Sequence, residues 1–439
     1  MSTDIVLALI IFVATYAFIV TEKIPPAAAA ILGGSLVVFL QLIPHEAALE
    51  KVDVDVVFLL AGMMLVVNVL SETGFFEWVA VTIAQRSRGH GMVILIGLIT
   101  ATAVLSAFLD NVTTVVLIIP ITILITQILE IRPEPFLILE ALFSNVGGTA
   151  TLIGDPPNIL IGAKSGLTFN QFILNLGPLV LVVLGLTSVI VYVIFRKSMT
   201  VTPEARKRIM MAHPSRAITD PRRLTIALPL FFLILLGFTL SHSLGVQPGL
   251  VALVGGFAMV VFTGSSLRRA FEKVEWETIF FLIGLFILVG ALEYNNLFDR
   301  LGEGLVTLTQ GSTLMAALAI LWLAGVLAAL LGAVPVAISL IPLVSAYVER
   351  MASEGAAAGA AAGGPPGEVL WWALALGACL GGNGTMLGTA ANVVVIQVAR
   401  KNRYHISFFE FARYGVPIML FSLVLSSVYL YLRYFLLTG

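Results

Sequence analysis

The chain alternates long apolar stretches with short polar segments, and most of the apolar stretches have the length of a membrane helix. A helix needs about 20 mostly apolar residues to cross the hydrocarbon core of a bilayer. Ten such segments are present, five on each side of a basic segment at 197–222. They lie near residues 4–21, 25–43, 54–71, 135–163, 172–196, 223–241, 247–263, 276–292, 368–399 and 414–436.

Two further apolar stretches, at 91–129 and 312–349, are too long for one span, and each is interrupted near its middle. The interruptions are LDNVTT at 109–114 and GAVPVAIS at 332–339. A helix that enters the bilayer, turns at a polar or Gly/Pro tip and returns on the same side would produce this pattern. We therefore predict an all-α polytopic membrane protein with about ten transmembrane helices and two re-entrant hairpins.

The second half of the chain repeats the first. Asp53 returns as Glu275, 222 positions later, and GGTATLIGDPPN at 147–158 corresponds to GGNGTMLGTAAN at 381–392. Because each half has five spans, the second copy is expected to be inverted in the membrane. Inverted repeats with helices broken near the midplane are typical of secondary transporters. The predicted parts are a first repeat at 1–196, a linker at 197–222 and a second repeat at 223–439, with broken helices at 135–163 and 368–399.

The distribution of positive charge predicts an orientation. Residues 196–223 hold eight Lys and Arg against two acidic residues, so we place them in the cytoplasm. Alternation of the spans then puts 19 of the 24 Lys and Arg on the cytoplasmic side, as the positive-inside tendency favours. The chain is thus expected to be a multi-pass protein of the cell inner (plasma) membrane with both termini outside. The Ala- and Gly-rich stretch 355–367 is expected to be an external loop.

Composition supports the membrane assignment and excludes several functions. The chain is 59% hydrophobic and 11% charged, against about 25% charged in soluble domains. A net charge of −1 without basic patches argues against a nucleic-acid partner. The single cysteine, Cys379, excludes an intramolecular disulfide. No nucleophile with a base and no metal-ligand spacing is found, so we expect no enzyme activity, no cofactor and no metal site, with membrane lipid as a partner.

The polar residues at the four breaks form the candidate site. Irregular backbone at membrane depth is tolerated where it is buried in protein or lines a wet cavity. A carboxylate there is costly and usually functional, so Asp110 and Asp155 are predicted to couple transport to protons. The alternative is that each acid only caps the helix that follows it. The predicted substrate- and ion-binding residues are Asp110, Asn111, Thr113, Thr114, Asn145, Thr149, Thr151, Asp155, Asn158, Asn383, Thr385, Thr389 and Asn392.

Three other polar residues are weaker candidates. Glu72 and Glu140 are expected near a membrane interface and at helix ends. Cys379 is expected to be a buried apolar filler.

Three motifs carry a resemblance to a known family. SAFLDNVTTVVLIIP at 106–120, SNVGGTATLIGDPPNILI at 144–161 and GGNGTMLGTAANVVV at 381–395 resemble signatures of the arsenical-pump permeases and NhaD-type Na⁺/H⁺ antiporters. That family includes the mammalian P protein and belongs to the ion transporter superfamily. The resemblance covers nearly the whole chain. It implies a homodimer with scaffold and transport domains, an elevator motion of the hairpins and broken helices, and ligands bound at the tips and breaks.

The second hairpin tip departs from the antiporter pattern. The antiporters and the P protein usually have an Asp-Asn pair there, whereas this chain has Gly332 and Ala333. Loss of one acidic site favours a neutral solute over a hard cation. We therefore expect proton-coupled efflux of arsenite or antimonite, with a cytoplasmic arsenical-pump ATPase as a possible partner, and keep Na⁺/H⁺ antiport as the alternative. A channel-like subunit fits the hydrophobicity but not the duplicated breaks.

Overall fold

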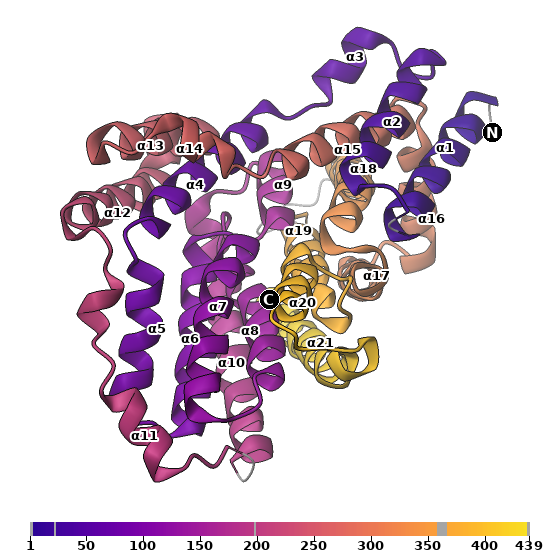
Figure 1. The fold of residues 1–439 in the computed structure, drawn as a ribbon. Helices are drawn as coiled ribbons and strands as arrows, with labels where there is room; N and C mark the ends of the chain where they lie inside the picture. The colour runs from indigo at the N-terminus through magenta and orange to yellow at the C-terminus, as the bar shows by residue number, and fades with distance from the viewer. Residues whose placement is uncertain (1–2, 22, 197–198, 358–366, 437–439) are drawn as a thin grey trace.

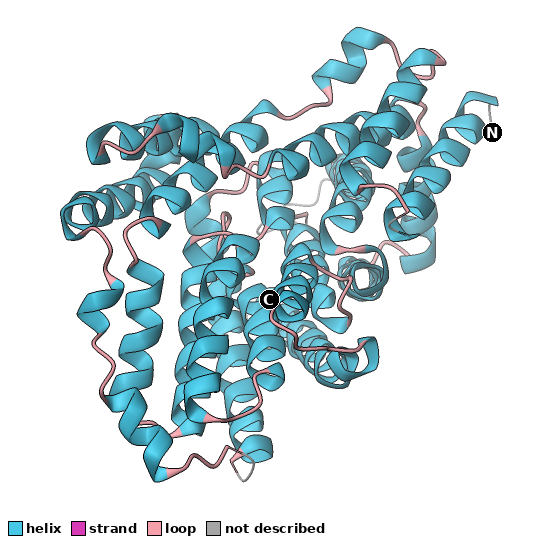
Figure 2. Cartoon of the chain, in the orientation of Figure 1, coloured by secondary structure: helices cyan, strands magenta, loops and turns pink. Residues whose placement is uncertain are grey.

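The computed structural model describes residues 3–21, 23–196, 199–357 and 367–436 of the chain. All regular structure in these residues is helical (Figure 2). Nine of the described helices are long and apolar enough to cross a membrane, and three shorter apolar helices accompany them. The predicted fold class, an all-α polytopic membrane protein, is confirmed.

One group of six helices, which we call the platform, lies along the upper part of Figure 1. Within it α4 packs against α13 and α15 packs against α2. A β-carbon on Gly62 of α4 would lie 2.3 Å from Ala252, and one on Gly284 of α15 would lie 2.4 Å from Ala30. Both crossings use the same positions of the two sequence repeats. The platform helices are α1 (Thr3–Thr21), α2 (Pro26–Phe39), α4 (Val54–Ser71), α12 (Pro221–Leu244), α13 (Pro248–Thr263) and α15 (Trp276–Tyr294).

The other long helices form a second group, the core, in which each half contributes the same set of elements. The predicted hairpins are the pairs α6/α7 and α17/α18, and the predicted broken helices are α8/α9 and α19/α20. Their re-entrant path through the bilayer stays a prediction. The core helices are α6 (Gly91–Phe108), α7 (Asn111–Leu129), α8 (Glu134–Gly148), α9 (Pro156–Ser165), α10 (Phe169–Phe195), α17 (Thr313–Leu331), α18 (Ala333–Ala357), α19 (Glu368–Gly381), α20 (Ala390–Lys401) and α21 (Phe408–Tyr431).

Several short helices were not predicted from the apolar pattern. Two of them, α5 and α16, follow the platform helices α4 and α15 at matching positions of the repeats, and α11 lies inside the predicted linker. They escaped prediction because they are too short or too polar to read as spans. The short helices are α3 (His45–Glu50), α5 (Phe75–Arg86), α11 (Pro203–Met210), η1 (Pro214–Ala217), α14 (Leu267–Glu272), α16 (Leu297–Thr309), η2 (Gly382–Gly384) and η3 (Leu432–Leu436).

The predicted external loop at 355–367 needs a correction. Helix α18 continues past the predicted end of the second hairpin to Ala357, so the first three residues of that loop are helical. Residues 358–366 of the loop lie outside the described residues. The continuation is explained by the alanine-rich sequence, because alanine has the highest helix propensity.

Candidate functional site

At the first broken helix, the side chains of Asn158 and Thr151 hydrogen-bond to backbone carbonyl groups around the break. Helix α8 ends at Gly148 and α9 begins at Pro156. The Asn158 side-chain amide donates to the carbonyl oxygens of Gly148, Thr149 and Thr151 at 3.5, 3.1 and 2.8 Å. The Thr151 hydroxyl donates to the carbonyl of Ala107 near the end of α6. These bonds satisfy carbonyl groups that a broken helix would otherwise leave unpaired in an apolar medium.

The second broken helix uses the same scheme. The Asn392 amide donates to the carbonyls of Gly382 and Thr385 at 3.0 and 2.9 Å. The Thr385 hydroxyl donates to the carbonyl of Ala329 in α17 at 2.5 Å. The donor groups of these two side chains, like those of Thr151 and Asn158, are therefore engaged with the protein backbone.

Asn145 connects the two breaks at the centre of the core. Its amide donates to Oδ1 of Asn383 at 2.8 Å and to Oδ1 of Asn392 at 3.0 Å. Its own Oδ1 accepts from the amide of Asn111 at 3.0 Å, and the same amide donates to Oδ1 of Asp155 at 3.1 Å. All five side chains are buried. The first hairpin tip, the first break and the second break thus share one hydrogen-bonded network.

Three oxygen atoms at the first tip have no hydrogen-bond partner within the described residues. They are Oδ2 of Asp110, Oδ1 of Asn111 and Oδ2 of Asp155. Each belongs to a buried side chain; the Asn111–Asp155 bond joins two of them, and Asp110 directly precedes Asn111 in the chain. Unpaired buried acceptors are unfavourable, so this cluster is suited to receive protons, hydrogen-bond donors or a cation.

The two acids behave differently as helix caps. Oδ1 of Asp110 accepts from the backbone N–H of Thr113 at 2.7 Å, so Asp110 does cap α7 while its second oxygen stays free. Asp155 precedes α9 but makes no side-chain cap bond. The N–H of Asn158, the position from which Asp110 and Thr389 receive their cap bonds, donates to the backbone carbonyl of Asp155 at 2.9 Å, and the Asp155 carboxylate accepts from Asn111 instead. The capping alternative is wrong for Asp155.

The remaining predicted threonines and Asn383 mainly contact backbone. The Thr114 hydroxyl donates to the carbonyl of Asp110, and that of Thr149 to the carbonyl of Asn145, both at 2.8 Å. Thr389 caps α20 by accepting from the N–H of Asn392 at 3.2 Å. The amide of Asn383 donates to the carbonyl of Leu142 at 3.3 Å. Thr113 enters the site through its backbone N–H.

The second hairpin tip is stabilised by hydrogen bonds of its backbone groups, whereas the first tip uses a carboxylate. Gly332 has φ 97°, a conformation that favours glycine. The N–H of Ala333 donates to the carbonyl of Gly388 at 2.9 Å, which ties this tip to the second break. From the platform, the Tyr16 hydroxyl donates to the carbonyl of Pro335 at 2.8 Å. No side-chain carboxylate takes part at this tip.

The structure also corrects the treatment of Glu140 and reveals a contact of Cys379. Glu140 lies in the middle of α8, 0% exposed, and is not at a helix end. Oε1 of Glu140 accepts from the Thr122 hydroxyl at 2.7 Å. The signal was available in the sequence, because the acid interrupts the apolar run FLILEALF at 136–143. The Cys379 thiol contacts Oδ1 of Asn158 at 3.4 Å, so this residue touches the first break.

Glu275 is a further acid near the site. It precedes α15 of the platform and accepts a hydrogen bond from the Thr278 hydroxyl at 3.1 Å. Burial, with the nearby charge of Asp110, raises the pKa of Glu275 to about 7. The first hairpin tip therefore lies close to a platform carboxylate, a relationship that sequence spacing alone could not reveal.

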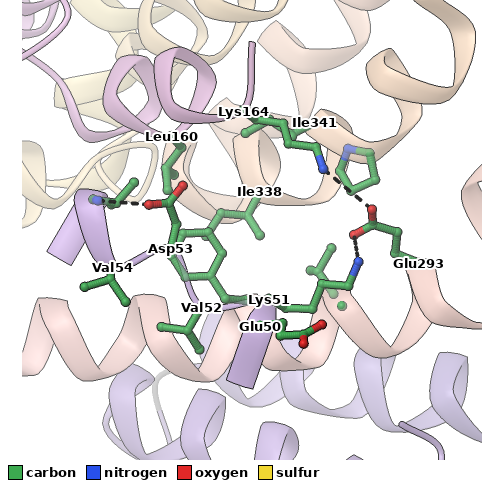
Figure 3. Close-up of a pocket in the computed structure, with 15 residues that line it drawn as sticks. Glu50, Lys51, Val52, Asp53, Val54, Leu160, Lys164, Glu293, Ile338 and Ile341 are labelled. Carbon is green, nitrogen blue, oxygen red and sulfur yellow. Dashed lines mark hydrogen bonds and ion pairs between the residues drawn. The ribbon is translucent and has the colours of Figure 1, made fainter. Parts of the chain in front are cut away.

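A cavity of about 440 Å³ separates part of the core from part of the platform (Figure 3). Lys51, before α4, and Lys164 of α9 point toward Glu293 of α15, with nitrogen–oxygen distances of 3.1 and 3.7 Å. The Lys164–Glu293 pair joins a core helix to a platform helix. This contact was not predicted from the sequence, because Lys164 and Glu293 are far apart in the chain.

Comparisons with known proteins identify the chain as a membrane transporter. A family model described as a citrate transporter matches residues 16–377. A 46 kDa membrane protein of Mycobacterium leprae is 37% identical over 99% of this chain and all of the relative. A protein of Mycobacterium tuberculosis named as an uncharacterized transporter is 39% identical over 98% of this chain and 99% of the relative.

A more distant relative connects the chain to a protein already expected from the motifs. The P protein of Homo sapiens is 29% identical over 98% of this chain and 60% of the relative. The expected relationship to the P protein is thus confirmed. The narrower assignment to arsenical-pump permeases and NhaD-type antiporters stays a prediction.

Proposed function

The chain belongs to the citrate transporter family, and from that premise we propose that it is a secondary active transporter coupled to protons at Asp110 and Asp155. The observation that carries the proposal is the cluster of three oxygens on Asp110, Asn111 and Asp155 that have no hydrogen-bond partner in the described part of the chain. A buried carboxylate without a cation partner is unfavourable when ionised. Binding and release of protons there would change the charge of the centre during each transport cycle.

For the solute, we propose efflux of arsenite or antimonite. Both are neutral hydroxides at neutral pH, and their three hydroxyl groups match three acceptor oxygens in number. The four break segments at 109–114, 145–158, 332–339 and 382–392 contain no Lys, Arg or His. A bare anion such as citrate would therefore meet no cationic side chain from these segments.

Na⁺/H⁺ antiport is the second candidate, because the same cluster of oxygens also suits the binding of a cation. Carboxylate and amide oxygens are suitable ligands for a hard cation. Against it stands the second tip, where Gly332 and Ala333 offer no carboxylate. The two candidates therefore differ in whether the free oxygens accept hydrogen bonds from a solute or coordinate a metal ion.

We also propose the architecture that the resemblance implies. The platform would act as the scaffold of a homodimer, and the core would move against it as an elevator. The matching platform crossings at Gly62 and Gly284 support two copies of one unit, with the second inverted. A partner ATPase on the cytoplasmic side belongs to the same proposal.

Single-cysteine labelling tests the orientation. In a chain without Cys379, we expect an impermeant thiol reagent to label Arg208→Cys only from the cytoplasm and Glu50→Cys from outside. Ser2 and Ala360, which are also expected outside, lie outside the described residues. Labelling of Arg208→Cys from outside would overturn the proposed topology.

Transport into everted vesicles tests the solute. We expect arsenite uptake driven by a pH gradient, with little Na⁺-dependent proton movement, and weaker uptake in the Asp110→Asn variant. Strong Na⁺/H⁺ exchange without arsenite uptake would replace the first candidate by the second. Citrate uptake with neither arsenite uptake nor Na⁺/H⁺ exchange would overturn both candidates and identify citrate as the solute.

A further inference from the structure

One buried acid takes no part in the central network. Glu140 is the seventh residue of α8 and is fully buried. Its Oε1 accepts from the Thr122 hydroxyl at 2.7 Å, and its Oε2 has no partner within the described residues. The carboxyl group thus has one engaged and one free oxygen inside the protein.

No positive charge compensates Glu140. It forms no ion pair in the part of the chain that the structure describes. Of the helices that pack against α8, α6, α7 and α10 contain no Lys, Arg or His, and the basic residues of α20 and α21 form no ion pair with Glu140 among the described residues. An ionised carboxylate in such a place is strongly unfavourable.

None of the titratable groups on the helices around α8 is hydrogen-bonded to Glu140 among the described residues. Asp110 and Glu130 stand at the two ends of α7, and Glu134 begins α8. The others are Tyr192 of α10, Glu368 and Cys379 of α19, Arg400 and Lys401 of α20, and Glu410, Arg413, Tyr414, Tyr429 and Tyr431 of α21.

The second half of the chain shows that the fold does not need this polar pair. Glu140 is the seventh residue of α8, and the seventh residue of α19 is Leu374. Thr122 is the twelfth residue of α7, and the twelfth of α18 is Val344. Leu374 and Val344 are both fully buried. The same packing of two helices is therefore achieved with apolar side chains, which argues that Glu140 serves chemistry.

Glu140 lies on the same helix as Asn145, a member of the central hydrogen-bonded network. Asn145, which binds Asn111, lies five residues further along α8, a rise of about 7.5 Å. Ser144 lies one turn after Glu140 on the same helix face. The acid therefore stands on the helix that leads into the network of Asn145, Asn111 and Asp155.

We propose that Glu140 is a second proton-binding site of the transporter, present only in the first half of the chain and carried by the same helix as Asn145 of the central network. The site binds H⁺ on its carboxyl group. When the proton leaves, the Thr122 hydroxyl stabilises the carboxylate. Proton binding is a property of Glu140 alone, whereas its use in coupling rests on the proposed function.

Infrared spectroscopy of the purified protein in lipid tests proton binding without any transport assay. We expect the carbonyl stretch of a protonated carboxyl group at neutral pH that disappears in Glu140→Gln and persists in Asp110→Asn and Asp155→Asn. The amide keeps the size of the side chain and its hydrogen bond to Thr122, so the variant should fold. If Glu140→Gln leaves the protonated-carboxyl band unchanged, the proposal is overturned whatever the solute is.

Transport assays test the use of this proton. We expect Glu140→Gln to lower pH-driven solute uptake by roughly tenfold or more and to change its pH profile. The double variant Glu140→Leu with Thr122→Val installs the pair of the second half and should fold with the same defect. Wild-type pH dependence in the double variant would show that Glu140 has no part in coupling. If no tested solute moves in wild type, the proposed function fails while the infrared result still decides proton binding.

Discussion

The two breaks of the core have the same backbone support but different chemistry. In both, an asparagine amide and a threonine hydroxyl bind the carbonyl groups around the break: Asn158 with Thr151, and Asn392 with Thr385. Only the first carries acids. A broken helix in this fold can thus be built without a carboxylate, so Asp155 at the first break is not explained by folding.

The residues that follow each break account for part of the difference. In the second half Thr389 caps α20 by binding the N–H of Asn392. In the first half the cap position is Asp155, and the next two residues are Pro156 and Pro157. Those prolines have no N–H, and the N–H of Asn158, which corresponds to that of Asn392, donates to the backbone carbonyl of Asp155 and not to its side chain. The acid of the first half is therefore not used as a cap.

The largest expected effect comes from giving the first break the chemistry of the second. Asp155→Thr installs the residue type of Thr389 and should preserve the fold, because the second half shows that threonine is accepted at this place. Proton-driven uptake in everted vesicles should fall to background, since the variant lacks one of the two acids proposed to carry protons. Thr389→Val is the matched control, because it removes the corresponding side chain of the second half without removing a titratable group; the uptake that remains should keep its wild-type pH dependence. Normal coupling in Asp155→Thr would remove Asp155 from the mechanism.

The shared support predicts equal stability effects in the two halves. Asn158→Ala and Asn392→Ala should each lower the free energy of unfolding by about 1–3 kcal/mol, because buried carbonyl groups lose their donors. Thermal unfolding in detergent, compared at one protein concentration, measures this. A large loss in one half with none in the other would contradict the structural equivalence of the breaks.

The second tip should depend on a glycine where the first depends on an acid. Gly332→Ala should reduce stability by about 1–3 kcal/mol, because φ 97° is strained for residues with a side chain. Gly304→Ala is a suitable control, because Gly304 lies within α16 and a β-carbon there would meet nothing within 4 Å. Equal stability of Gly332→Ala and Gly304→Ala would show that the second tip tolerates another conformation.

The dependence of stability on pH should report the environment of Glu275. Because the pKa of Glu275 is raised to about 7 in the folded protein, the folded state holds this proton more tightly than the unfolded state. The Glu275 contribution to stability should therefore decrease as pH rises from about 4.5 to about 7. Unfolding measured across this range should show a smaller decrease in Glu275→Gln. An identical pH dependence in the variant and the wild type would contradict this environment for Glu275.

The smallest expected effect concerns the ion pair between core and platform. Lys164→Met should change the free energy of unfolding by less than about 1 kcal/mol, because the pair with Glu293 is partly exposed. The difference between variant and wild type should shrink further at high salt. A salt-independent loss of several kcal/mol would indicate a dry, strongly coupled contact between the two groups of helices.

Much of this molecule could be predicted from local patterns. The apolar lengths located the long helices, and the Gly, Pro and polar interruptions located the four breaks between helices, because helix formation depends on residues that are close in sequence. The repeat also identified Asn158 and Asn392, and Thr151 and Thr385, as equivalent positions, and each pair makes matching hydrogen bonds at the two breaks. The capping role of Asp110 could be proposed from its position before a helix, and the structure confirms it.

Other features depended on which segments meet. Asn145 binds Asn383 and Asn392, more than 230 positions away, and Asp155 accepts from Asn111 of the first hairpin and not from its own helix. Glu140 could be judged correctly only when it was seen to be buried, hydrogen-bonded to Thr122 and without an ion pair among the described residues. The sequence alone determined where the chain is helical and where it breaks, because those properties are local. Tertiary structure decided which polar atoms are paired and which stay free, because hydrogen bonds and burial in the core join residues that are distant in the chain.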